Sequence, residues 1–185
     1  DPMMLMVSGI LKLGLLTEHI PLKDVISEIT TKKVIQKIKS LTDTLTKDFL
    51  IKDPKIAILS INPHVGDNGV IGSDDQNILI PAIKDLNKDN NLIFGPFSAD
   101  TFFCNENHKQ YDGIVAAYHD QGLIPFKTIS FGKGVNYSSG LPIIRTSPDH
   151  GTGFDIAGQG IASTSSFIQA LKVGLDIYKS RNRID

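Results

Sequence analysis

Three short apolar runs, each followed abruptly by a polar segment, constrain the fold of this chain more than any other feature. They are Leu11–Thr17, Ile56–Ile61 and Ile114–Ala117. Continuous apolar stretches of this length are typical of strands that are buried on both faces, as in a parallel sheet covered by helices. Within a few residues, each run is followed by a histidine: His19, His64 and His119.

Helical patterns separate these runs. Apolar residues at helical spacing predict an amphipathic helix from about Thr31 to Leu50. Further helices are expected over Asp75–Asn87, over Ser165–Ser180 and from Phe154 onward, with a helical turn at Asp100–Asn105. Shorter strands are expected at Leu92–Phe94 and Pro142–Thr146. Strands that alternate with helices indicate an α/β fold with a layered sheet, parallel at least in part.

The composition narrows the classes of function. A net charge of −1 gives no electrostatic basis for binding nucleic acid or an anionic membrane. No apolar run approaches the roughly 20 residues of a membrane span. The single cysteine, Cys104, excludes an internal disulfide and favours the reducing cytoplasm. The opening Asp1-Pro2-Met3 is unlike a natural start, so we expect a piece of a longer protein.

The three histidines after the apolar runs suggest a metal site. The carboxyl edge of the sheet is where open α/β folds build their sites, and neutral imidazole is the commonest metal ligand among side chains. Each histidine alone also fits a structural role, and their spacing matches no short zinc motif. His108 lies in a polar stretch and is expected at the surface. His150 lies in a tight turn that fits a site or a simple corner.

Several other polar residues are candidates for binding or catalysis. Lys127, Asn136 and Arg145 lie among glycines and apolar residues, where a cation is either an anion binder or a surface residue with a buried stem. The guanidinium of Arg145 suits bidentate binding of carboxylate or phosphate. Asp100 and Asp120 could orient imidazole ligands, although helix capping also explains Asp100.

Six blocks in this order resemble the 4-hydroxythreonine-4-phosphate dehydrogenases of pyridoxal phosphate (vitamin B6) biosynthesis, over nearly the whole chain. The blocks are Thr17–Leu22, Asn62–Gly66, Gly95–Thr101, Tyr118–Gly122, Phe131–Asn136 and Gly140–Thr152. The resemblance implies an α/β/α layered sheet of the isocitrate/isopropylmalate dehydrogenase-like type. It assigns residues 1–165 to a metal- and substrate-binding, dimerisation domain. The helix in residues 166–185 would pack on an amino-terminal cofactor domain that this chain lacks.

The resemblance also implies a site shared by two subunits of a homodimer. His19 and His64 of one subunit and His119 of the other would bind a divalent metal, zinc by preference for imidazoles, with magnesium or cobalt as alternatives. Substrate would be held by Lys127, Asn136 and Arg145. Asp100, Asp120 and Lys127 would line the cavity as catalytic groups, while no residue is assigned to the nicotinamide cofactor.

The implied reaction is oxidation of the C3 hydroxyl of 4-phosphooxy-L-threonine with NAD or NADP, followed by loss of CO2. The product is 3-amino-2-oxopropyl phosphate. One alternative is a paralogue that acts on 4-phospho-threonate or 4-phospho-erythronate, and another is a non-catalytic, metal-binding dimeric fragment. The family's substrate-binding His-Thr pair is absent from this chain, so we expect these residues alone to be inactive. Ser73–Gln76 replaces a paired-glutamate helix start, and Ser and Asp are good helix caps.

Overall fold

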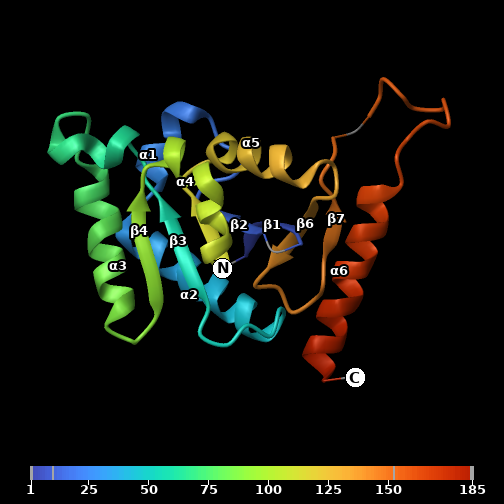
Figure 1. Ribbon diagram of the computed structural model, residues 1–185, viewed down its shortest axis with the longest axis horizontal. Coiled ribbons are helices and arrows are strands. Elements are labelled where there is room, and N and C mark those ends of the chain that lie inside the picture. Colours follow the sequence, from blue (N-terminus) through green and yellow to red (C-terminus); the bar gives the residue numbers. More distant parts are fainter. Residues whose placement is uncertain (1, 10, 152, 184–185) are drawn as a thin grey trace.

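A mixed sheet of seven strands forms the centre of the computed structural model, which describes residues 2–9, 11–151 and 153–183 (Figure 1). The order of the strands is β4-β3-β5-β2-β1-β6-β7. Their bounds are β1 (Met3–Ser8), β2 (Leu11–Leu15), β3 (Lys55–Leu59), β4 (Leu92–Phe97), β5 (Gly113–Ala116), β6 (Val135–Ser139) and β7 (Thr146–Pro148). The pairs β3–β4, β3–β5 and β2–β5 are parallel, whereas β1 is antiparallel to β2 and β6, and β6 to β7.

Helices cover both faces of this sheet. They are η1 (Leu22–Asp24), α1 (Val25–Glu28), α2 (Thr31–Lys47), η2 (Pro63–Gly69), η3 (Asp75–Leu79), α3 (Ile80–Asn87), α4 (Ala99–Phe102), η4 (Cys104–Gln110), α5 (His119–Ser130) and α6 (Ser165–Asn182). Side chains of α1, α2, α3 and α6 form one apolar core with one face of the sheet. Those of α4 and α5 form a second core on the opposite face. The predicted three-layer α/β/α fold is therefore confirmed.

Helix α2 shows how the sequence determines these layers. The side chain of Thr30 caps the helix by accepting a hydrogen bond from the backbone N–H of Lys33 at 3.2 Å. Four side chains on one face are fully buried against the sheet, as the helical spacing predicts. They are Val34, Ile38, Leu41 and Leu45.

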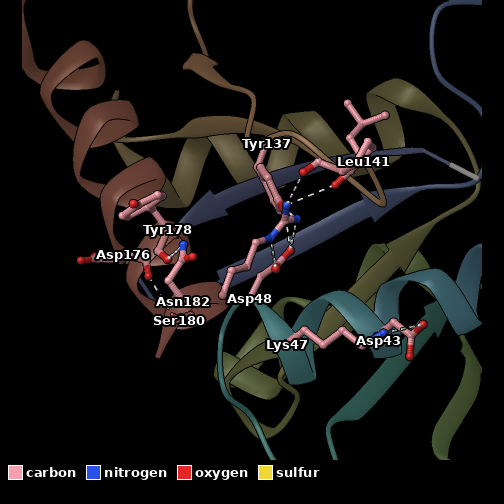
Figure 2. A network of polar contacts seen from close by, with 11 residues as sticks. Asp43, Lys47, Asp48, Tyr137, Leu141, Asp176, Tyr178, Ser180 and Asn182 are labelled. Atoms are coloured by element: carbon pink, nitrogen blue, oxygen red, sulfur yellow. Dashed lines mark hydrogen bonds and ion pairs between the residues drawn. The ribbon is translucent and has the colours of Figure 1, made fainter. Parts of the chain in front are cut away.

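Helix α6 is fixed to the rest of the molecule by a buried polar network (Figure 2). Arg181 donates hydrogen bonds to both carboxylate oxygens of Asp48, at 2.7 and 3.1 Å, just beyond the end of α2. The hydroxyl of Tyr137 on β6 donates to the same carboxylate and accepts from Arg181 at 2.9 Å. Arg181 also donates to the backbone oxygen of Leu141 at 3.2 Å. One carboxylate thus joins α2, β6 and α6.

Some of the predictions of secondary structure and exposure are wrong. Residues 154–160 form turns rather than a helix, and the last strand lies at Thr146–Pro148 instead of Pro142–Thr146. Strands β1 and β6 and helix α5 are additional to those expected. His108 is only 8% exposed rather than at the surface, because its ring packs on that of Phe103. Among the described residues, no helix is both long and apolar enough to span a membrane.

Candidate metal centre

The three strands that precede His19, His64 and His119 are neighbours in the sheet. They are β2, β3 and β5, with β5 in the middle and parallel to both others. The carboxyl ends of parallel strands lie at the same edge, so the chain leaves all three strands on one side of the molecule. This edge is the usual binding site in open α/β sheets.

His19 and His119 lie close together because the pairing of β2 with β5 continues beyond the strand ends. The backbone N–H of Thr17 donates to the carbonyl of Ala117 at 3.2 Å, and the Thr17 hydroxyl donates to the same oxygen at 2.8 Å. Each histidine follows two residues later. Their ring centroids are 5.4 Å apart, with the planes tilted by 47°.

Helix α5 begins at His119 and lies very close to β2. A Cβ atom at Gly122 would lie 2.6 Å from the side chain of Leu13 and 3.0 Å from the Cβ atom of Ala116, so a larger residue here would have to displace its neighbours. Asp120, on the first turn, places its Oδ1 2.7 Å from Nδ1 of His119. This contact fixes the ring and leaves Nε2 as the nitrogen available to a ligand.

His64 is exposed and lies in η2, between β3 and η3. Asp74 and Asp75, at the start of η3, do not cap that helix as expected. Their side chains instead accept hydrogen bonds from the segment that precedes His64. Asp75 accepts hydrogen bonds from the backbone N–H groups of Ile61 and Asn62, at 2.8 and 2.9 Å. Asp74 accepts from the side chain of Asn62 at 2.9 Å.

Asp100 follows β4 on α4, next to the strand that leads to His64. A hydrogen bond of 2.7 Å from the hydroxyl of Ser98 holds the pKa of the Asp100 carboxyl below its usual value, and the charge of His64 acts in the same direction. Asp100 is therefore an ionised acceptor near the histidine edge at neutral pH.

Two adjoining cavities open at this edge. One, of about 600 Å³, is lined by nine residues that include His19, His119 and Asp120. The other, of about 550 Å³, is lined by eleven residues that include Asp100 and Asp120. Imidazoles and carboxylates around one space form a donor set that suits a divalent ion of the zinc type. Within the described residues, however, no three His, Cys, Asp or Glu side chains of a single chain gather closely enough to hold a metal ion.

The three predicted substrate residues lie on different elements. Lys127 is exposed on α5, and Asn136 lies on β6 with its Oδ1 buried and without a hydrogen-bond partner. Arg145, before β7, is exposed and donates to the hydroxyl of Ser138 at 2.8 Å. In the described part of the chain, no hydrogen bond or ion pair joins these three side chains to one another.

Two residues that organise this edge escaped the sequence analysis. The side chain of Gln121 accepts from the backbone N–H of Ala117 and donates to the carbonyl of Ser60, both at 2.7 Å, so it links the ends of β5 and β3. The other is Asp75, which holds the segment before His64. Gln121 belongs to a block quoted for the resemblance, which is the signal that could have drawn attention to it.

The fold and this edge define an α/β protein of the class that places its site at the carboxyl ends of parallel strands. Residues 1–174 match the family described as pyridoxal phosphate biosynthetic protein PdxA. The chain belongs to that family, which confirms the resemblance.

Individual relatives agree. The chain is 44% identical, over 181 residues, to a 4-hydroxythreonine-4-phosphate dehydrogenase of Bacteroides thetaiotaomicron, covering 98% of this chain and 50% of that protein. It is 52% identical, over 171 residues, to the protein of that name in a Sulfurihydrogenibium species, with 92% and 52% covered. The crystal structure of a Klebsiella pneumoniae 4-hydroxythreonine-4-phosphate dehydrogenase has a TM-score of 0.82 at 35% identity, covering 98% of this chain and 54% of that one. The chain spans about half the length of these relatives.

Proposed function

We propose that this chain is the metal- and substrate-binding part of an NAD-dependent dehydrogenase that oxidises and decarboxylates 4-phosphooxy-L-threonine to 3-amino-2-oxopropyl phosphate. Membership of the PdxA family carries this proposal, together with the close pair His19 and His119 at the edge where the fold places a site. NADP is the alternative cofactor. The single, exposed cysteine Cys104 favours the cytoplasm as the compartment.

His19, His64 and His119 are the proposed ligands of a divalent metal, with zinc ahead of magnesium and cobalt for a set of imidazoles. When bound, such an ion acts as a Lewis acid that favours ionisation of the substrate hydroxyl and stabilises negative charge during decarboxylation. The cavity beside His19 and His119 leaves room for substrate oxygens. Asp120 contributes by holding the His119 ring in one orientation.

The chain's other polar groups would bind substrate and move protons. Arg145 carries a planar guanidinium for the phosphate or the carboxylate. Asn136 has a buried oxygen that lacks a donor, which a substrate N–H or hydroxyl can supply. Asp100 is held ionised by Ser98 and can accept a proton or a hydrogen bond. Lys127 is exposed on α5 and can donate or accept a proton once a substrate covers it.

A second copy of the chain is the proposed partner at this edge. Leu22 and Ile124 line the cavity of His19 and His119 while exposing 71% and 66% of their surface. Large apolar side chains around a polar cavity favour an interface between subunits. In the arrangement that the resemblance implies, His19 and His64 of one subunit meet His119 of the other. The contact between His19 and His119 within one chain favours a second arrangement, in which His64 comes from the partner.

Residues 1–165 form the proposed dimerisation and binding domain, and the helix within 166–185 is proposed to pack on an amino-terminal cofactor domain. One side of α6 packs on the rest of the molecule through the buried side chains of Ala170 and Ile177. The other side carries three apolar residues spaced four apart, Phe167, Leu171 and Leu175, whose exposed fractions are 55%, 61% and 54%. An apolar stripe of this kind requires a partner surface.

The direct test is the formation of NADH from 4-phosphooxy-L-threonine by the protein expressed from its complete gene. We expect turnover that a chelator abolishes and added Zn²⁺, Co²⁺ or Mg²⁺ restores. Turnover only of 4-phospho-threonate or 4-phospho-erythronate would replace this proposal with the paralogue. The 185-residue chain alone should bind metal without turnover. If the complete gene product also binds metal and oxidises none of these substrates, the protein is a binding module.

A further inference from the structure

The turn η2, which carries His64, has a backbone that L residues avoid. Its φ angles are positive over six successive residues: His64 (51°), Val65 (57°), Gly66 (77°), Asp67 (43°), Asn68 (53°) and Gly69 (95°). In this left-handed conformation the Cβ atom crowds the following carbonyl oxygen, and a β-branched residue such as Val65 is affected most. Such a run persists only where its surroundings hold it in place.

The carboxylate of Asp75 holds the start of this turn. It is fully buried and accepts the backbone N–H groups of Ile61 and Asn62, one on each oxygen. These two N–H groups lie between the end of β3 and Pro63, so they set the direction in which the chain enters η2. Hydrogen bonds to an ionised acceptor are shorter and stronger than neutral ones.

The residues on either side of Asp75 hold the turn at two more points. Asp74 binds the side chain of Asn62, and Gln76 donates to the carbonyl of Val65 at 3.1 Å. A Cβ atom at Gly66 would lie 2.2 Å from the carbonyl oxygen of Gly72, so the turn also packs tightly on the segment that leads to η3. The bonds of residues 74–76 thus attach to the chain on both sides of His64.

We propose that Asp75 is a positioning residue for His64: its carboxylate fixes the strained turn so that the imidazole is presented to the metal site. This inference rests on the proposed function, because it assumes that His64 is a ligand. Asp75 itself need not touch metal or substrate. Its contribution is to prevent the turn from relaxing toward right-handed backbone conformations, which would move the imidazole away from the edge of the sheet.

The test is Co²⁺ binding by the dimer expressed from the complete gene. Titration measures the affinity, and the visible absorption spectrum of the bound ion reports its ligands. In Asp75→Asn an amide N–H₂ group replaces one of the two carboxylate oxygens. This donor then faces the backbone N–H of Ile61 or Asn62, so one of the two hydrogen bonds is lost. We expect Co²⁺ affinity to fall by about 10- to 100-fold, the usual effect of removing a group that orients a ligand. The spectrum should shift toward that of His64→Ala. Asp85→Asn, on the exposed surface of α3, is the matched control and should bind Co²⁺ as the wild type does.

The double variant separates positioning from general stability. With His64 already replaced by alanine, Asp75→Asn should cause no further loss of Co²⁺ affinity, because the imidazole that it positions is gone. An equal loss in both backgrounds, or wild-type affinity in Asp75→Asn, overturns the inference. If His64→Ala binds Co²⁺ with unchanged affinity and spectrum, the proposed function fails at this ligand.

A gentler substitution keeps the test decisive should Asp75→Asn fail to fold. Gln76→Met preserves the size of a half-buried side chain and removes only the hydrogen bond to Val65. We expect a several-fold loss of Co²⁺ affinity that disappears in the His64→Ala background. Wild-type affinity in Gln76→Met would show that the hydrogen bonds of residues 74–76 to the turn do not determine the position of the His64 imidazole, which also overturns the inference.

Discussion

The imidazole rings of His19 and His119 lie with their centroids 5.4 Å apart in a single chain. The cause is the register of two parallel strands, since the pairing of β2 with β5 continues to Thr17 and Ala117, two residues before each histidine. The spacing from the last paired residue is therefore equal on both strands.

The contact makes the assignment of ligands to subunits testable. His19→Ala and His119→Ala homodimers should both lose metal-dependent turnover. If His19 and His64 of one subunit meet His119 of the other, a dimer of one His119→Ala and one His19→Ala subunit has one intact site. Random mixing should then restore about a quarter of the wild-type activity, because half of the dimers are mixed and one of their two sites is complete.

A second mixture gives the opposite result for the alternative arrangement. If His19 and His119 act from the same chain, mixing their two variants restores nothing. Mixing His19→Ala with His64→Ala then restores about a quarter of the activity, because the mixed dimer again holds one complete site. Absence of recovery in both mixtures would contradict a site shared between subunits. The measurement is NADH formation after the variants are unfolded together and refolded, with wild type treated in the same way.

Local sequence predicted the elements whose own residues determine them. Helix α2 was found because its buried stripe repeats at helical spacing, and β2, β3 and β5 because each is made up mainly of apolar residues that are buried in the sheet. Helix α5 was missed because Gly122 and Pro125 weaken the helical pattern. Its glycine allows close packing on Leu13 and Ala116, a feature of tertiary structure that a local pattern does not contain.

The residues of the site also fall into those that local sequence predicts and those that it does not. The positions of the histidines at strand ends could be predicted, since they depend only on where apolar runs stop. The roles of Asp75 and Gln121 could not, because each binds backbone groups that lie far away in sequence. His108 misled for a related reason: its polar neighbours indicate exposure, whereas its ring is buried against Phe103.

Replacing Asp120 should weaken metal binding through His119. Asp120→Ala removes the acceptor at Nδ1, so the ring loses both its orientation and the nearby negative charge. We expect Co²⁺ affinity to fall about 10- to 100-fold, and less in Asp120→Asn, whose oxygen still accepts from Nδ1–H. Titration with Co²⁺ measures this, with Asp43→Asn as a control on the far, exposed part of α2. Equal losses for both Asp120 variants would argue that charge alone matters.

Arg181→Met should destabilise the fold without changing the affinity for metal. The substitution leaves the carboxylate of Asp48, which is only 5% exposed, with a single donor in Tyr137. Breaking a buried ion pair on one side costs about 3 kcal/mol of unfolding free energy. Urea unfolding measures the loss, and Lys179→Met, an exposed cation two residues earlier on α6, should change stability by less than about 0.5 kcal/mol. A loss of that small size in Arg181→Met would mean that the network does not anchor α6.

The same network predicts how stability falls at alkaline pH. Burial, and then the Asp48 carboxylate, raise the pKa of the Tyr137 phenol well above its usual value of about 10. Below that value both the folded and the unfolded chain keep this proton, so the stabilising contribution is complete. Above it the unfolded chain releases the proton while the folded chain retains it, so the free energy of unfolding falls as pH rises.

Tyr137→Phe removes this dependence because it has no proton to release. The difference in unfolding free energy between wild type and Tyr137→Phe should be constant from about pH 7 to pH 9. At higher pH the wild type should lose unfolding free energy relative to Tyr137→Phe, by up to about 1.4 kcal/mol for each further pH unit. Urea unfolding of both proteins at intervals up to about pH 11 measures this difference, and all other tyrosines cancel in the comparison. A difference that stays constant over the whole range would mean that the Tyr137 phenol ionises in the folded protein as readily as in the unfolded chain.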